Sequence, residues 1–454
     1  MPYRQLADFL EELGRAGELA RVDANVSPVV EIAEATRRAA RESGPALLFA
    51  TAGGHDAPVL TNLFGTERRV CRAMEVDGPA EGADKVDRLL RSTGSEGWFE
   101  RLRAGGHVGP LASLAPRRVK SGACQQIVRL GGDVNLEELP LLQADAGEAG
   151  PTIASAVAVS AEPDSHAQTA GRYDFQWLGR DRLAACWADQ DEPARLLTEY
   201  GRRGGRMPVA LVLGGDPVFL LAAAAPVPSA VDPLGLAGLL RDKPLDAVAC
   251  RTIDLSIPAE ADIVVEGYVD PAEPPVPAGP RSTAYGQLSP PRPAAVLHVT
   301  AVTHRANRIY VATVPGPVPC ESAVVTRTMA RVFLPLLRLT IPELVDFDLP
   351  LSGEGRHWAV LAIRKTYAGQ SRRVASIAWG LRPFLAAKFL VVVDEGLDVR
   401  DWPQVTQAMA AHAEPGRDLF FYEDPDGGRL VGIDATRKGN TVNFPFSGCR
   451  SNQG

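Results

Sequence analysis

The chain has 454 residues, of which 45% are hydrophobic and 23% are charged, a length and balance expected for roughly two to three globular domains. Its formal net charge of −7 argues against a nucleic-acid-binding protein, because phosphate binding needs clustered Lys and Arg. The six cysteines form no CxxC or CxxH pair, so a structural zinc site is not expected. The start lacks the apolar core of a signal peptide, and no run of about 18 uncharged apolar residues follows, which predicts a cytoplasmic protein without a membrane span.

The first third of the chain is typical of an α/β module. Apolar residues at near-helical spacing predict a helix that starts at Leu6 and ends before Gly14 and Gly17. Further helices are expected over 30–42 and 84–91, and the apolar run 46–50 predicts a buried strand. The stretch 105–120 is rich in Gly, Pro and Arg and is interpreted as a linker.

The middle of the chain is dominated by short β-rich segments. Their density suggests a barrel or sandwich rather than alternating βαβ units, although helices are expected over 193–203 and 234–240. The Pro-rich segment 270–281 is too long for an ordinary connection and is interpreted as a loop near a functional site. The expected strands are 152–160, 172–178, 208–213, 218–224, 263–269, 295–303 and 308–314.

The last third returns to an α/β pattern. Helices are expected over 322–337 and 372–387, and strands over 358–363 and 389–393. The second strand, FLVVV, is uninterrupted and apolar, which predicts a buried strand at the centre of a sheet.

Several motifs occur in the order in which one enzyme family carries them. They are RLGGDVNLEELPLL at 129–142, IPAEADIVVEG at 257–267, VVVDEGLDVRD at 391–401 and GIDATRK at 432–438. The segments 171–187 and 209–238 add weaker matches. Together they resemble the UbiD-like decarboxylases, of the 3-octaprenyl-4-hydroxybenzoate carboxy-lyase type, over nearly the whole chain.

The resemblance implies a multidomain α/β fold. The expected parts are an N-terminal α/β domain (1–115), a central split β-barrel like those of flavin reductases that binds the cofactor (116–318), and a C-terminal α/β dimerisation domain (319–454). It also implies prenylated FMN, made by a flavin prenyltransferase, together with a divalent metal (manganese or magnesium) and potassium. The implied reaction is reversible, non-oxidative decarboxylation of an aromatic or α,β-unsaturated carboxylic acid by a homodimer or larger homo-oligomer.

The resemblance also assigns catalytic positions. Glu266 falls on the glutamate of the family's EG motif and is the expected proton donor, since a carboxylate at the end of an apolar strand has a raised pKa. Asp262 stands where the family usually has a second Glu. The alternative for Glu266 is a strand-end residue that faces water or a Lys.

The family arginine that binds the substrate carboxylate is replaced by Asp174. Arg172 lies two residues earlier, so strand alternation places it on the same face, where it could take over the carboxylate contact. The alternative is a solvent-facing Arg172 that pairs with Asp174. The family's EGPFG loop becomes Ala278 to Arg281, which loses another acid.

The family's metal ligands are also replaced, and Thr169 and Pro233 occupy two of their positions. Oxygen ligands suit magnesium or manganese, so Asp191, Glu192 and Asp232 could form a shifted site. Alternatively, Asp191 and Glu192 cap the helix that follows them.

Lys438 lies in an intact family motif and is expected to reach the cofactor phosphate, with an ordinary surface lysine as the alternative. The segment 222–225 would offer backbone N–H groups to a phosphate, or it is a buried strand. The remaining positions that we expect to bind the cofactor are Ser155, Gln190, Ala224, Ala225 and Pro226.

Two functions therefore stay open. One is a decarboxylase, which Glu266 and Lys438 support. The other is a non-catalytic or repurposed UbiD-like subunit that has lost the metal and Glu-Arg-Glu site, which Asp174, Thr169 and Pro233 support.

Overall fold

The computed structural model describes residues 3–93, 114–228, 231–283, 286–317, 319–351, 357–423 and 428–438. It divides into two compact units, Met1–Leu336 with Leu351–Gly355 and Leu337–Pro350 with Arg356–Gly454. The expected linker at 105–120 lies largely outside the described residues, and the division into three domains stays a prediction. None of the helices in the described ranges is long and apolar enough to cross a membrane.

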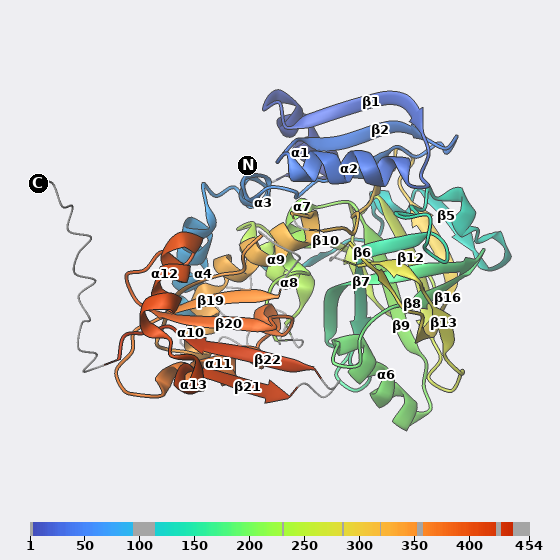
Figure 1. Cartoon of the computed structure of the whole chain (residues 1–454). Coiled ribbons are helices and arrows are strands. Elements are labelled where there is room, and N and C mark those ends of the chain that lie inside the picture. Colours follow the sequence, from blue (N-terminus) through green and yellow to red (C-terminus); the bar gives the residue numbers. More distant parts are fainter. Residues whose placement is uncertain are drawn as a thin grey trace, which may run out of the picture. The chain divides into compact units, whose positions relative to one another are not determined.

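The N-terminal part of the first unit, coloured blue in Figure 1, contributes helices and three strands to a sheet whose fourth strand comes from later in the chain. As the spacing predicts, the helix that starts at Leu6 buries Leu6, Phe9, Leu10 and Leu13. The sheet order is β1-β2-β3-β17, so the segment expected as a strand at 308–314 contributes only two residues, and it adds them to this sheet. The elements are α1 (Leu6–Arg15), β1 (Leu19–Val26), α2 (Glu31–Arg41), β2 (Ala46–Ala52), β3 (Val59–Thr61), α3 (Glu67–Ala73), α4 (Pro79–Thr93) and β17 (Tyr310–Val311).

A closed six-stranded barrel forms the middle of the first unit, which confirms the expected barrel. The strands run in the order β12-β9-β6-β7-β8-β16, and β12 pairs with β16 to close the ring. Alternate residues of all six strands point into one apolar core, among them Ala158, Phe175, Leu183, Leu211, Val265 and Leu297. The strands are β6 (Thr152–Ala161), β7 (Gln168–Gly179), β8 (Arg182–Ala185), β9 (Met207–Leu213), β12 (Ile263–Val269) and β16 (Arg292–His304).

Shorter strands surround the barrel. The segment 270–281, expected as a loop, contains β13 (Val276–Ala278), which pairs with β16, so that expectation is wrong for its second half. The other short strands are β4 (Arg117–Arg118), β5 (Ile127–Leu130), β10 (Asp246–Ala249), β11 (Ser256–Pro258), β14 (Arg281–Ser282) and β15 (Leu288–Ser289).

The strand expected at 218–224 is wrong, because this segment begins with the helix α7 (Pro217–Ala222). Asp216 caps the helix by accepting hydrogen bonds from the N–H groups of Val218 (2.8 Å) and Phe219 (3.1 Å). A short apolar run that is buried on every side has no periodicity to separate helix from strand. The two expected helices are present as α6 (Glu192–Arg203) and α8 (Pro233–Leu240).

The single helix expected over 322–337 is two helices, α9 (Glu321–Val332) and α10 (Leu334–Thr340). Pro335 lies in the first turn of α10, a position that tolerates proline, whereas the interior of one long helix does not. The helical spacing of apolar residues continues from α9 into α10, so it does not indicate where the first helix ends.

In its described residues, the second unit has a sheet of order β18-β19-β20-β22-β21 and the helices α11, α12 and α13, together with the end of α10. The apolar strand β20 is central and parallel to both neighbours, as expected. The helix expected to reach residue 387 ends at Trp379, where Gly380 and Pro383 follow. The elements are β18 (Leu344–Asp348), β19 (Trp358–Ile363), α11 (Gln370–Trp379), β20 (Phe389–Asp394), α12 (Trp402–His412), α13 (Pro415–Asp418), β21 (Leu419–Glu423) and β22 (Arg429–Asp434).

Asp262, at the start of β12, joins two turns of the first unit. Its Oδ2 accepts a hydrogen bond from the N–H of Gly215 (2.8 Å), and its Oδ1 accepts one from the N–H of Ile309 (3.1 Å). Gly214 has a φ of 74°, and a Cβ there would lie 2.5 Å from Asp262 Oδ2, so the turn needs glycine. Burial raises the pKa of Asp262 to about 6, against the opposing effect of the N–H of Ile309.

This raised pKa predicts a pH-dependent contribution to stability. Below pH 3.8 Asp262 is protonated in both the folded and the unfolded chain, and between pH 3.8 and about 6 the unfolded chain ionises it while the folded chain keeps the proton. Relative to Asp262→Asn, the wild-type chain should therefore lose about 2 kcal/mol of unfolding free energy between pH 4 and pH 7.5. Urea unfolding at both pH values checks this.

Asp23→Asn removes an exposed carboxylate, 81% accessible, and is the matched control. Parallel pH profiles for the wild type and Asp262→Asn would contradict the expected linkage.

A candidate ligand site at the bulge of strand β6

The pairing of β6 with β7 is interrupted by a bulge between Ile153 and Ala156. Ser155, inside the bulge, has a φ of 53°, which a residue other than glycine adopts only when its surroundings hold it there. Its N–H donates a hydrogen bond to Asp174 Oδ1 (2.8 Å). Bulges of this kind change the direction in which neighbouring side chains point, and they are common beside functional sites.

Arg172 extends from β7 across this bulge. Its Nε donates to the carbonyl oxygen of Ser155 (3.4 Å), and its Nη2 donates to Thr313 Oγ1 (3.1 Å). The structure therefore brings together two of the predicted site residues, Arg172 and Ser155. Both line a hollow of about 370 Å³, counting the open solvent at its mouth, which we call the first hollow; Gly214, Thr313 and Glu321 also line it.

Glu321 is a site residue that the sequence analysis missed. It is the first residue of α9 and is only 5% exposed. Its Oε1 accepts a hydrogen bond from the N–H of Phe64 (3.1 Å), whereas its buried Oε2 has no hydrogen-bond partner among the described residues. Burial raises the pKa of Glu321, and the charges of Arg172 and Arg69 act in the opposite direction.

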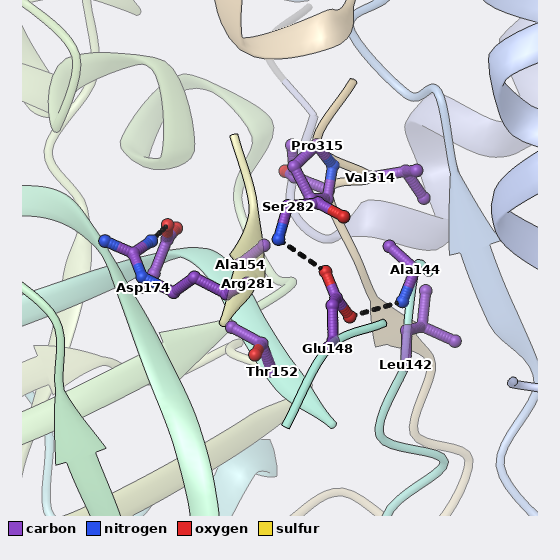
Figure 2. Close-up of a pocket in the computed structure, with 11 residues that line it drawn as sticks. Leu142, Ala144, Glu148, Thr152, Ala154, Asp174, Arg281, Ser282, Val314 and Pro315 are labelled. Atoms are coloured by element: carbon purple, nitrogen blue, oxygen red, sulfur yellow. Dashed lines mark hydrogen bonds and ion pairs between the residues drawn. The ribbon is translucent and has the colours of Figure 1, made fainter. Parts of the chain in front are cut away.

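Arg281 balances the charge of Asp174 by forming an ion pair with Asp174 Oδ2 (Figure 2). Its Nη2 also donates a hydrogen bond to the carbonyl oxygen of Cys186 (3.5 Å). Arg281 comes from β14, more than 100 positions along the chain, in the segment that the sequence analysis regarded only as the loss of an acid. The carboxylate of Asp174 on β7 is thus paired with a guanidinium from another element.

Arg281 and Asp174 line a second hollow of about 300 Å³, again counting open solvent, which contains a further acid, Glu148 (Figure 2). Both oxygens of Glu148 accept backbone hydrogen bonds, from Ala144 and from Ser282, each 2.8 Å long. The two hollows share Ala154 and Thr313 in their linings, so they lie next to each other.

The structure gives Glu266 a set of partners away from both hollows. It is fully buried and accepts hydrogen bonds from the N–H of Arg251 (2.8 and 2.9 Å), the N–H of Thr252 (2.7 Å) and Thr252 Oγ1 (2.9 Å). It therefore anchors the 250–252 turn on β12. Asp262 lies directly behind Gly214, which lines the first hollow. The catalytic roles of Glu266 and Asp262 stay predictions.

The residues expected as metal ligands are placed at helix starts. Asp232 caps α8 through the N–H groups of Leu234 (3.3 Å) and Gly235 (3.0 Å). Asp191 accepts from the N–H of Ala188 (2.8 Å), and Glu192 pairs with Arg195. Within the described ranges, no three His, Cys, Asp or Glu side chains are grouped closely enough to hold a metal ion, so the expected metal site at these residues is not formed.

The expected cofactor positions are scattered. The N–H groups of Ala224 (2.9 Å) and Ala225 (3.0 Å) donate to Leu221 and Ala222 at the end of α7, so they are engaged within the chain and not offered to a phosphate as expected. Pro226 follows them, and Gln190 is exposed before α6.

Lys438 lies in the second unit, where its Nζ donates to the carbonyl oxygen of His412 (2.9 Å) and is 3.4 Å from Asp418 Oδ2. Among the predicted positions, Arg172 and Ser155 line the first hollow, where the guanidinium can bind an anionic or carbonyl-bearing group.

Three models of the 3-octaprenyl-4-hydroxybenzoate carboxy-lyase family match the chain: the N-terminal domain over 10–89, the Rift-related domain over 117–318 and the C-terminal domain over 323–432. An uncharacterized protein of Archaeoglobus fulgidus is 35% identical over 453 residues, covering 96% of this chain and 92% of that protein.

Two solved structures are similar over nearly their whole length. The UbiD-class enzyme HmfF from Pelotomaculum thermopropionicum, in an evolved dimeric form in complex with prFMN, has a TM-score of 0.79 at 29% identity, covering 96% of both chains. Vanillic acid decarboxylase from Sedimentibacter hydroxybenzoicus has a TM-score of 0.81 at 26% identity, covering 100% of this chain and 95% of that one. The motifs, the closed barrel and these matches lead to one conclusion: the chain belongs to the UbiD family.

Proposed function

We propose that this chain catalyses the reversible, non-oxidative decarboxylation of an aromatic or α,β-unsaturated carboxylic acid with prenylated FMN. The observation that carries the proposal is the guanidinium of Arg172, which lines the first hollow beside the bulge of the barrel strand β6. Two structural relatives support it, because one is described in complex with prFMN and another is a vanillic acid decarboxylase.

Arg172 would bind the substrate carboxylate, since a planar guanidinium can donate two parallel hydrogen bonds to it. Thr313 Oγ1 and the carbonyl oxygen of Ser155 hold the guanidinium in place. Prenylated FMN, when bound, would supply the electron sink for the carbon that loses CO₂. Glu266 remains the proposed proton donor, and the proposed cofactor positions are Ser155, Gln190, Pro226 and Lys438.

The proposal assigns no step to a divalent metal or to potassium. The acids expected as metal ligands already cap or accept from backbone N–H groups, and they are not grouped. The second candidate is a non-catalytic or repurposed UbiD-like subunit. Flavin binding and turnover separate the two.

We also propose that the chain acts as a homodimer or larger homo-oligomer and receives its cofactor from a flavin prenyltransferase. The dimeric form of HmfF supports the first point by analogy.

The first prediction concerns the cofactor. Chain co-expressed with a flavin prenyltransferase should co-purify with prenylated FMN, identified by its mass and absorbance spectrum, and should release CO₂ from at least one of a panel of benzoic, furoic and cinnamic acids. Arg172→Met should keep the flavin and lose turnover. A chain that takes up no flavin under these conditions would support the non-catalytic subunit.

The second prediction concerns Glu266. If it delivers the proton, Glu266→Gln should lower turnover of the folded variant about 10²–10⁴-fold, because the amide cannot readily release a proton. Solvent deuterium should enter the product more slowly as well. The melting temperature should fall in either case, because the amide NH₂ replaces an oxygen that accepts from a backbone N–H, so a near-parental rate in the folded variant would assign Glu266 to anchoring the 250–252 turn alone.

A further inference from the structure

Glu321 brings a buried carboxyl group to the lining of the first hollow. Its Oε1 accepts a hydrogen bond from the N–H of Phe64 (3.1 Å), and the N–H of Asn62 also acts on the carboxyl. Its Oε2 makes no hydrogen bond of normal geometry within the described part of the chain. Buried polar atoms are nearly always paired, with protein, water or a ligand, so a molecule that enters the hollow can supply the hydrogen bond that Oε2 lacks.

Two positive charges act on Glu321, Arg69 from α3 and Arg172 from β7. Arg69 is almost fully buried, and its donors are engaged by Glu18 and by backbone carbonyl groups that include Leu63 (3.0 Å) and Asn62 (3.1 Å). Arg172 is the one of the two that lines the hollow. A ligand there meets one guanidinium and one carboxyl group, with the hydroxyl of Thr313 beside them.

We propose that the first hollow binds the carboxylate of a small organic acid between Arg172 and Glu321, and that Glu321 binds it in its protonated form, donating a hydrogen bond from Oε2. This deepens the proposed function, because the bound carboxylate would be that of the substrate. Glu321 is a binding residue here and is assigned no step of bond making.

The proton on Glu321 is required because the ligand also carries a carboxylate. Two ionised carboxylates that share one site repel each other, so one of them keeps a proton, as in paired carboxylate sites. Burial already raises the pKa of Glu321, which favours the neutral form of this carboxyl. Arg172 then compensates the single negative charge of the ligand.

This arrangement fixes the sign of the pH dependence. Below the pKa of Glu321 the carboxyl is protonated and donates, so binding is strongest. Above that pKa, binding must take up one proton, and the affinity should fall by up to tenfold for each pH unit. The number of protons taken up should approach one.

The test is calorimetric titration of the flavin-free full-length chain with benzoate and acetate between pH 5.5 and 9, in buffers of different ionisation enthalpy. Wild-type chain should show proton uptake and an affinity that falls with pH. Glu321→Gln keeps an acceptor for the N–H of Phe64 and offers a permanent N–H donor in place of the acid. It should therefore bind with little pH dependence and no proton uptake.

Three further variants complete the design. Arg172→Met and Arg172→Lys should weaken binding at least tenfold at pH 6, the Met variant more strongly, because neither donates a bidentate pair. Glu67→Gln removes a carboxylate on α3 that pairs with Arg331 and should keep the wild-type pH profile. Circular dichroism and melting temperature establish that each variant is folded.

Inorganic phosphate and FMN form the second arm of the titration, since a flavin phosphate is the other anion that could pair with Arg172. If phosphate competes with benzoate and the affinity for benzoate does not change with pH, the carboxylate assignment is overturned. Identical proton uptake in wild type and Glu321→Gln would also overturn it. Proton-linked benzoate binding by a chain that never decarboxylates with prenylated FMN would leave this inference standing and contradict only the proposed function.

Discussion

The geometry of the candidate site depends on one hydrogen bond, from the N–H of Ser155 to Asp174 Oδ1 (2.8 Å). It helps to hold a serine at a φ of 53°, a conformation that costs about 1–3 kcal/mol outside a supporting framework. With Ser155 turned in this way, its carbonyl oxygen accepts from Arg172 (3.4 Å). The bulge therefore organises both charged residues of β7, Arg172 at the first hollow and Asp174 at the second.

The ion pair between Asp174 and Arg281 balances the negative charge of a half-buried aspartate in the middle of the barrel wall. The guanidinium comes from a strand that is distant in sequence. Arg172 contacts Ser155 and Thr313 instead, at the lining of the first hollow. Each of the two adjacent hollows is therefore lined by a guanidinium, Arg172 in the first and Arg281 in the second.

Much of the fold follows from local sequence. The strand at 263–269 and the apolar strand that begins at Phe389 were predictable, because buried strands are β-branched and bounded by turn residues. The helix at 217–222 was not, because a run that is buried on all sides has no periodicity. The break before α10 was missed for a similar reason, since the apolar pattern runs across it.

The site was predictable only where neighbours in space are also near in sequence or aligned with family motifs. Arg172 and Ser155 were identified in this way, and they do meet. Arg281 and Glu321 were missed because their significance lies in contacts with residues more than 100 positions away. A glutamate at the start of a helix is common on electrostatic grounds alone, so its unpaired oxygen becomes visible only in three dimensions.

The central claim is that a substrate carboxylate binds at the first hollow, and a crystal structure of the chain with 4-bromobenzoate tests it most directly. The anomalous signal of bromine locates the ring independently of the protein atoms. The account predicts a carboxylate within hydrogen-bonding distance of the Arg172 guanidinium and of Glu321 Oε2. A carboxylate bound instead to Arg281 in the second hollow, with Glu321 Oε2 still unpaired, would contradict it.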